Sequence, residues 1–341
     1  MTQTLSSPTE LLRFDAAGMM TLLEDAPARA QRHFQQGQRH PVSACSPHQV
    51  LICGMGGSGS TGDLLQALCP DSRIPVLINK SGRLPAWVGP ETLVLGVSYS
   101  GGTAETLQAL AQAHAAGAQL HLPSAGGAVQ AFAEQHALSH VPFQGGLPPR
   151  SALLDMLFAL LGSLQALDSL QLPAAPEMGL DFLRNETPTI AAEALTLARQ
   201  LQSHDLMLWG ADAFSSLIAL RWKNQFSENS KLLATCSALP ELNHNEMVAM
   251  CASCHSQTLL LYLTLESEIS AFDRVSLELA RPHLANILPV LARGQHHLER
   301  VLYLTCLGDF ASVWLALLNA TDPTPIAPID EFKRRIALLS P

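Results

Sequence analysis

The chain has 341 residues, of which 48% are hydrophobic and only 14% charged, and its formal net charge is −9. This length fits two domains with a core each, and the small share of charged residues favours an oligomer that buries additional surface. The negative charge argues against a nucleic acid or an anionic membrane as partner, because both attract basic patches.

The N-terminus and the cysteines indicate a cytoplasmic protein. Residues 1–8 contain neither a basic segment nor an apolar one, so they do not resemble a secretory signal. Apolar stretches such as Leu259–Leu263 are too short to cross a bilayer. Seven cysteines, an odd number in a long chain, fit a reducing compartment better than a disulfide framework.

The region from about residue 47 to residue 143 alternates strands with helices. Strands are predicted at Val50–Cys53, Val76–Asn79, Leu93–Ser98 and Gln119–Leu122. Helices are predicted at Ser60–Leu68, Thr103–Ala115 and Ala128–Gln135. Strands separated by helices of this length imply βαβ units and a parallel, doubly wound sheet. A Gly- and Pro-rich run at 145–150 breaks the pattern, and we place the domain boundary there, between residues 147 and 148.

A second α/β block is predicted after this boundary. A long apolar helix from Ser151 to about Leu167 comes first, followed by a polar helix over Thr189–Gln202 and a strand over Leu206–Trp209. Further elements are a helix at Phe214–Asn229, strands at Thr258–Leu263 and Val301–Thr305, and a helix at Phe310–Asn319. The strand–glycine–helix unit at Gly54 recurs at Gly210. The predicted fold class is therefore α/β, with two similar doubly wound parallel-sheet domains, 1–147 and 148–341.

A glycine-rich turn, Gly54–Gly62, follows the first strand. Glycines let the backbone approach a ligand, and amide groups at a helix start attract an anion. The Gly-x-Gly-x-x-Gly spacing also matches the dinucleotide fingerprint. However, the second strand ends in Asn79-Lys80 without the carboxylate that would hold a ribose, and no Lys-Ser or Lys-Thr pair follows as in a P-loop. The first absence disfavours a dinucleotide site, and the second disfavours a P-loop.

A second turn, Ser98–Thr103, follows the third strand and carries hydroxyls beside a Gly-Gly pair. Thr103 stands where it can cap the next helix, which would explain one hydroxyl but not those of Ser98 and Ser100 as well. Two such turns in one sheet predict a site for the phosphate of a small molecule, held by hydroxyls and amide dipoles.

Cys251-Ala-Ser-Cys254-His255 has the haem-attachment pattern, and its cysteine pair could also be redox-active or half of a zinc site. Haem attachment of this kind requires export, and no second cysteine pair completes a zinc site. We therefore interpret these as chance cysteines near a buried strand and predict no metal.

The densest polar segments are Lys223–Lys231 and Pro240–Glu246. Uncharged amides crowd Glu228 and His244 there, whereas an ordinary solvated helix favours Lys and Glu. Amides orient carboxylates and imidazoles. A carboxylate base beside a titratable histidine is what proton transfer next to a carbonyl requires.

With these residues the chain resembles the bifunctional phosphoglucose/phosphomannose isomerase family, built from two sugar-isomerase (SIS) domains. The resemblance spans nearly the whole chain. It rests on Gly54–Gly59, Ser98–Thr103, Pro148–Arg150, Asn224–Lys231, Glu241–Glu246, Asp322–Pro325 and Lys333. Gly102 departs from the pattern, because the family usually has Asn there, and the segment Gly294–His297 has no role that the resemblance assigns.

The resemblance implies a flavodoxin-like fold and the interconversion of glucose 6-phosphate, and mannose 6-phosphate as a second substrate, with fructose 6-phosphate, without metal or cofactor. The phosphate would be held by Gly57, Ser58, Ser98, Ser100 and Thr103. By the same resemblance, Glu228 would move the proton between C2 and C1 through a cis-enediolate, and Arg150 would stabilise its negative charge. His244 and Lys333 would help to open the sugar ring, and His244 would be supplied across the interface of a homodimer.

Two other functions stay open at this point. A non-catalytic SIS module that senses a phosphosugar and regulates a partner would not need Glu228, His244 and Arg150. A dinucleotide-dependent oxidoreductase would need the carboxylate that the second strand lacks. If the chain is an isomerase, its choice between glucose and mannose is expected to depend on the space around C2 and on a threonine near 322–325.

Overall fold

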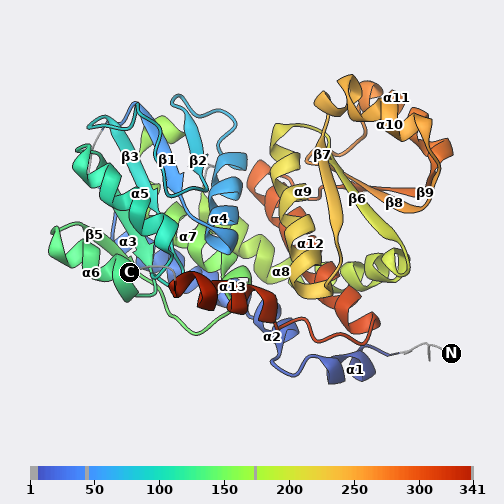
Figure 1. The fold of residues 1–341 in the computed structure, drawn as a ribbon, viewed down its shortest axis with the longest axis horizontal. Helices are drawn as coiled ribbons and strands as arrows, with labels where there is room; N and C mark the ends of the chain where they lie inside the picture. The colour runs from blue at the N-terminus through green and yellow to red at the C-terminus, as the bar shows by residue number, and fades with distance from the viewer. Residues whose placement is uncertain (1–6, 43–45, 173–174, 339–341) are drawn as a thin grey trace.

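Two parallel β-sheets, side by side, form the frame of the molecule in the computed structural model (Figure 1), which describes residues 7–42, 46–172 and 175–338. Residues 1–6, from which we predict the absence of an export signal, lie outside these ranges. The two sheets confirm the predicted fold class.

The first sheet has the strand order β2-β1-β3-β4-β5, with every pairing parallel. Its strands are β1 (Gln49–Cys53), β2 (Val76–Asn79), β3 (Thr92–Gly96), β4 (Gln119–Ser124) and β5 (Ser139–Pro142). This order is that of the flavodoxin-like doubly wound fold. The four predicted strands are confirmed, and β5 is an additional edge strand.

Helices cover both faces of the first sheet. They include α4 (Gly56–Ala67), α5 (Ala104–Ala115) and α6 (Gly127–Gln135). All three were predicted, but α4 begins at Gly56 instead of Ser60. Most of the glycine-rich stretch therefore forms the first two turns of a helix, and Ser58 lies in the first of them.

The second sheet has the order β7-β6-β8-β9, again fully parallel. Its strands are β6 (Asp205–Gly210), β7 (Ala234–Ala238), β8 (His255–Thr264) and β9 (Leu284–Leu291), and its helices include α9 (Ala213–Gln225), α10 (Glu246–Ala252) and α11 (Ala271–Ala280). β6 takes the place that β1 has in the first sheet, so the predicted repeat of the strand–glycine–helix unit is confirmed.

The strand predicted at Val301–Thr305 is wrong, because these residues lie inside α12 (His297–Leu318). The helix is buried on all sides, and a continuous apolar run does not distinguish such a helix from a buried strand. By length and hydropathy it would also qualify as a membrane span, but 94% of its apolar window is buried inside the protein, as in a core helix.

The segment Gly294–His297 starts this helix. His296 is its N-cap residue, and the ring Nε2 of His297 donates to the carbonyl of Ala67, at the end of α4, at 2.7 Å. The segment therefore connects the second lobe, which is the second sheet with its helices, to the first lobe, which is the first sheet with its helices.

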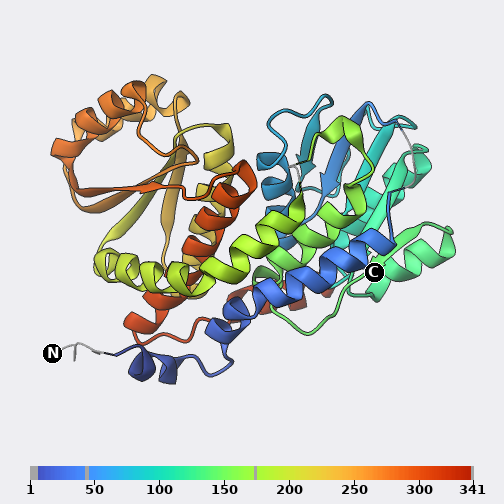
Figure 2. The same ribbon diagram turned by 180° about the vertical axis from the view of Figure 1, so that it is seen from behind.

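Long helices join the two lobes. α8 (Pro176–Leu201) is longer than the helix predicted at Thr189–Gln202, because it continues through Pro188, a residue that normally ends a helix. It packs on α12, whereas α7 (Leu153–Leu164) packs on α3 (Ala26–Arg39) and α4 (Figure 2). The remaining α-helices are α1 (Pro8–Leu11), α2 (Met19–Glu24) and α13 (Ala327–Ala337).

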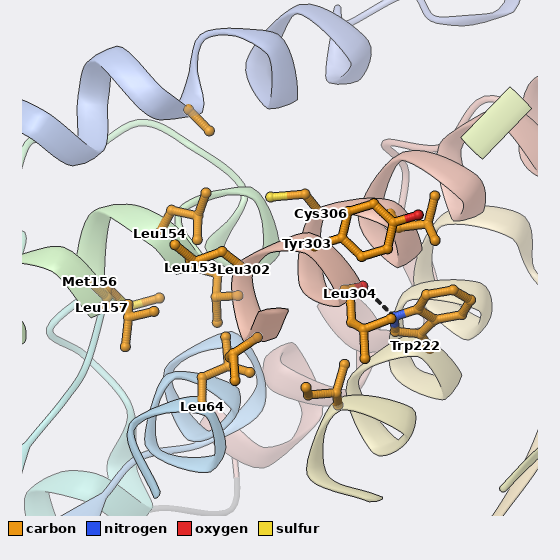
Figure 3. Close-up of a cluster of buried hydrophobic side chains, with 14 of the residues drawn as sticks. Leu64, Leu153, Leu154, Met156, Leu157, Trp222, Leu302, Tyr303, Leu304 and Cys306 are labelled. Carbon is orange, nitrogen blue, oxygen red and sulfur yellow. Dashed lines mark hydrogen bonds between the residues drawn. The ribbon is translucent and has the colours of Figure 1, made fainter. Parts of the chain in front are cut away.

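The largest hydrophobic core runs without interruption between the lobes. Leu64 of α4, Leu157 of α7, Leu302 of α12 and Trp222 of α9 all belong to this core (Figure 3). The indole N–H of Trp222 donates to the carbonyl of Leu304 at 2.8 Å. The domain boundary between residues 147 and 148 stays a prediction; it falls in the loop before α7.

The crossing of α3 and α7 depends on two glycines. A Cβ atom on Gly162 would lie 2.3 Å from the carbonyl oxygen of Phe34, and one on Gly37 would lie 2.0 Å from that of Ala159. The two backbones therefore touch. Nearby, the guanidinium of Arg29 on α3 donates to the buried carboxylate of Asp155 on α7 at 3.0 Å.

We expect Gly162→Ala to destabilise the protein, although alanine favours helix formation over glycine by about 1 kcal/mol. The added methyl must push α3 away, and overpacking of this kind costs roughly 1–3 kcal/mol. Chemical denaturation measures the change. Gly89→Ala is the control, because its Cβ would meet nothing within 4 Å. Equal stability of the two variants would contradict the assigned backbone contact.

Candidate active site

Two helix starts stand at the carboxyl ends of neighbouring strands in the first sheet. α4 follows β1 and α5 follows β3, and no side chain caps either helix. In the second sheet, by contrast, the carboxylate of Asp212 caps α9 by accepting hydrogen bonds from the N–H groups of Phe214 and Ser215. Because uncapped amides at a helix start attract an anion, the first sheet offers the donors that the predicted anion site needs.

The predicted phosphate ligands gather at this edge. The Ser58 hydroxyl accepts a hydrogen bond from the N–H of Tyr99 at 3.0 Å, which ties the two turns together. The Ser98 hydroxyl donates to that of Thr103 at 3.2 Å, and Thr103 forms no side-chain cap on α5. Ser100 is exposed on the same turn. The Thr103 hydroxyl therefore does not cap α5, although its position in the sequence would allow this function.

Arg150 lies directly beside the first turn, on the short 3₁₀-helix η2 (Pro149–Ser151). A Cβ atom on Gly57 would lie 2.7 Å from the carbonyl oxygen of Pro149 and 3.1 Å from the nitrogen of Arg150. Glycine at position 57 thus allows the start of α4 to touch the backbone that carries the arginine.

The Arg150 side chain is buried, with a relative exposure of 3%, and directs its donors at two segments, the turn at 228–229 and the loop at 323–324. Its Nε donates to Asn229 Oδ1 at 2.7 Å, and Nη1 lies 3.5 Å from Glu228 Oε2. Nη2 donates to the carbonyls of Pro323 and Thr324 at 3.0 and 2.9 Å. The arginine therefore joins residues that are far apart in the sequence.

Glu228 lies on a π-helical turn, Phe226–Ser230, which continues α9. Such turns are rare and often occur at functional sites. Two neighbours anchor the turn to α12, because Asn229 donates to the Ser312 hydroxyl at 2.9 Å and Ser230 donates to the Ser312 carbonyl at 2.6 Å. The Glu228 side chain remains 27% exposed. A rigid turn thus presents a partly open carboxylate.

Positive charge surrounds this carboxylate. Burial lowers the pKa of Arg150, and Glu228 partly opposes that shift. Burial also lowers the pKa of Lys231, as does the nearby Arg150. The Lys231 ammonium donates to the carbonyls of Glu228 and Pro323. Lys231 ends the polar segment Lys223–Lys231, but its place in the sequence alone predicts no function for it.

Arg221 and Asp309 were not predicted as site residues. The Arg221 side chain donates to the Arg150 carbonyl at 3.0 Å and to the Asp309 carboxylate at 2.6 Å, and Gln225 donates to the other Asp309 oxygen at 3.0 Å. All these groups are buried. A lone aspartate within the apolar run of α12 was the one indication of this support in the sequence.

The structure does not bring His244 or Lys333 to this cluster. His244 is exposed on a 3₁₀-helix, Glu241–His244, directly before α10, which lies on the side of the second lobe away from the first sheet (Figure 1). Lys333 is exposed on α13. Within the described ranges, neither side chain forms a hydrogen bond or ion pair with Glu228 or Arg150.

Among residues 7–42, 46–172 and 175–338, no group of three or more His, Cys, Asp and Glu side chains could hold a metal ion. Cys251 and Cys254 are exposed free thiols. The geometry offers an anion site at two helix starts and, beside it, a carboxylate next to a fixed guanidinium. Such a pair can move a proton while stabilising developing negative charge.

Comparisons with known proteins point to one family. Residues 190–336 match the family described as the bacterial phospho-glucose isomerase C-terminal SIS domain. The bifunctional phosphoglucose/phosphomannose isomerase of Caldicellulosiruptor bescii is 32% identical over 336 residues, which cover 94% of this chain and 99% of that protein. The enzyme of the same name from Thermoplasma acidophilum is 29% identical, covering 84% and 89%.

Among solved structures, a hypothetical protein from Thermus thermophilus superposes with a TM-score of 0.74 at 17% identity, covering 98% of this chain and 94% of that one. This similarity supports the fold. The sequence relatives settle the family: the chain belongs to the bifunctional phosphoglucose/phosphomannose isomerases.

Proposed function

We propose that the protein interconverts glucose 6-phosphate and fructose 6-phosphate, and mannose 6-phosphate and fructose 6-phosphate, by proton transfer between C1 and C2. The observation that carries this proposal is the Glu228–Arg150 pair, which the contact between Gly57 and Pro149 joins to the phosphate turns. The phosphate binds at the starts of α4 and α5, and the carbonyl end of the sugar lies at Glu228.

In this mechanism the Glu228 carboxylate takes the proton from C2 of the open-chain aldose and returns it to C1 of the ketose. A cis-enediolate forms in between, and its negative oxygen is stabilised by Arg150. The guanidinium is already held by Asn229 and two carbonyls, so little reorganisation is needed as the charge develops. Lys231 adds a second positive charge nearby.

In this reaction Thr324 forms a hydrogen bond with a substrate oxygen near C2. Its hydroxyl is buried and has no partner, and its carbonyl accepts from Arg150. An unpaired buried hydroxyl costs free energy that a substrate oxygen would recover. This supports the expectation that the segment 322–325 governs acceptance of both C2 epimers.

The site is completed in a homodimer, where His244 of a second copy and Lys333 open the sugar ring. Support comes from two exposed apolar side chains on the helices that follow His244 in the chain, since Val248 of α10 and Phe272 of α11 are 75% and 76% exposed. Apolar side chains this exposed favour coverage by a partner. A cytoplasmic location is part of this proposal.

Glu228→Gln is expected to lower kcat for both aldose phosphates by roughly 10²–10⁴-fold, the usual contribution of a general base. Calorimetric titration with glucose 6-phosphate should give a nearly unchanged Kd, since the phosphate turns are intact. The exposed Glu268→Gln is the matched control, and EDTA should leave wild-type turnover unchanged. Turnover retained by the variant would contradict the assignment. A wild type that binds sugar phosphates without turnover would favour the sensor.

Thr103→Ala is expected to raise KM for glucose 6-phosphate several-fold and to change kcat less. The variant removes one hydroxyl donor from the phosphate and leaves the Ser98 hydroxyl without its partner. Steady-state kinetics with a coupled assay for fructose 6-phosphate measure both constants. Thr196→Ala, an exposed threonine on α8, is the control. A fall in kcat alone would remove Thr103 from the phosphate site.

The shared site is tested by mixing two inactive variants, His244→Ala and Glu228→Gln. After subunit exchange, half of the dimers are mixed and each contains one site with both residues intact, so about a quarter of wild-type activity returns. If His244 acts within its own chain, the mixture stays inactive.

A further inference from the structure

A third turn lies against the turn Ser98–Thr103, called the phosphate turn below, on the side away from Ser58. It follows β4, comprises Ser124–Gly127 and leads into α6. The extension of β4 pairs with that of β3, since Ser98 and Ser124 form a parallel bridge and the N–H of Ala125 donates to the carbonyl of Tyr99 at 3.0 Å. Backbone pairing therefore joins the third turn to the phosphate turn.

Gly101 and Gly126 make the closest contact between the two turns. Both have positive φ, of 68° and 120°, and a Cβ atom on Gly101 would lie 1.8 Å from the carbonyl oxygen of Gly126. Moreover, the Gly101 carbonyl accepts from the N–H of Val129 in the first turn of α6 at 2.9 Å. The start of α6 thus donates to the phosphate turn. The third turn can therefore act on a ligand only through the phosphate turn.

Ser124 holds the third turn in shape. Its side chain is fully buried, and its hydroxyl lies 3.1 Å from the carbonyl oxygen of Gly126 and 3.3 Å from the N–H of the same residue. From β5, the ring Nε2 of His140 reaches the same hydroxyl at 2.8 Å. One hydroxyl therefore connects the edge strand to the carbonyl that touches Gly101.

We propose that Ser124, fixed by His140, is a positioning residue for substrate phosphate: it sets the position of Gly126 and, through Gly101, the conformation of the turn Ser98–Thr103. This inference rests on the proposed function, because it assumes that this turn binds the phosphate. The inference goes beyond that function, because Ser124 does not touch the ligand and acts through its contacts with Gly126 and Gly101.

The histidine makes this chain sensitive to pH. Burial and the neighbouring His40 lower the pKa of His140, whereas Glu134 on α6 opposes the shift. His121 on β4 also faces it and is itself buried, with a pKa lowered to about 4. At neutral pH His140 is therefore uncharged, and its Nε2 can accept the Ser124 proton. Once His140 is protonated, Nε2 becomes a donor, and the Ser124 proton must go to Gly126.

Ser124→Ala is expected to raise KM for glucose 6-phosphate, and Ki for inorganic phosphate, by the same factor of about ten, with kcat changed less than about twofold. Ser139→Ala is the control, since Ser139 contacts His121 but not the third turn. Thermal melts confirm that both variants fold. A fall in kcat at constant KM, or an unchanged Ki, would overturn the proposal.

His140→Gln provides the second test, because an amide does not titrate. The ratio of its KM to the wild-type KM should change as the pH drops from about 7.5 to about 5.5, since only in the wild type does the His140–Ser124 hydrogen bond reverse its direction. Ionisation of the substrate phosphate cancels in this ratio, and a constant ratio would overturn the assigned function of His140. If the wild type turned over neither sugar phosphate, the proposed function would fail, while calorimetric titration with inorganic phosphate would still test Ser124.

Discussion

The buried guanidinium of Arg150 is the interaction on which the site depends. A charge with 3% exposure is stable only if its donors are satisfied, and the acceptors come from the turn at Glu228 and Asn229 and from the carbonyls of Pro323 and Thr324. Each acceptor lies on a different segment from the arginine. Satisfying one side chain therefore fixes the start of α7, the end of α9 and the loop before α13 relative to one another.

The same constraint determines where Glu228, the proposed base, lies. If the turn at Glu228 shifted, Arg150 would lose both a charge partner and Asn229, and the buried cation would be left unsatisfied at a cost of several kcal/mol. Ser312 holds this turn from α12, and Arg221 holds the Arg150 backbone from α9. The carboxylate is thus positioned by the protein before substrate binds, which is the condition for efficient proton transfer.

The sequence predicts those parts of the fold and of the site that depend on residues near one another in the chain. β1 and β3 are short apolar runs followed by turns, and Ser58, Ser98 and Thr103 stand at fixed offsets from those strands. It could not predict the acceptors at Pro323 and Thr324, because a backbone carbonyl leaves no trace in the sequence. The apolar stretch at Val301–Thr305 was misassigned, since burial on all sides removes the helical period. The π-helical turn follows from tertiary anchoring rather than from local propensity.

The two lobes share one topology but use opposite ends of equivalent helices. In the first lobe, α4 leaves its start without a side-chain cap, so its amides can take an anion from outside the chain. In the second lobe, Asp212 occupies the start of α9 with the chain's own carboxylate, which excludes a phosphate by charge and by saturation of the donors. Instead, α9 contributes its C-terminal end, where the helix widens into the π-helical turn that carries Glu228. In the proposed mechanism one lobe thus holds the phosphate and the other the base, and this mechanism requires the interface between the lobes to be rigid.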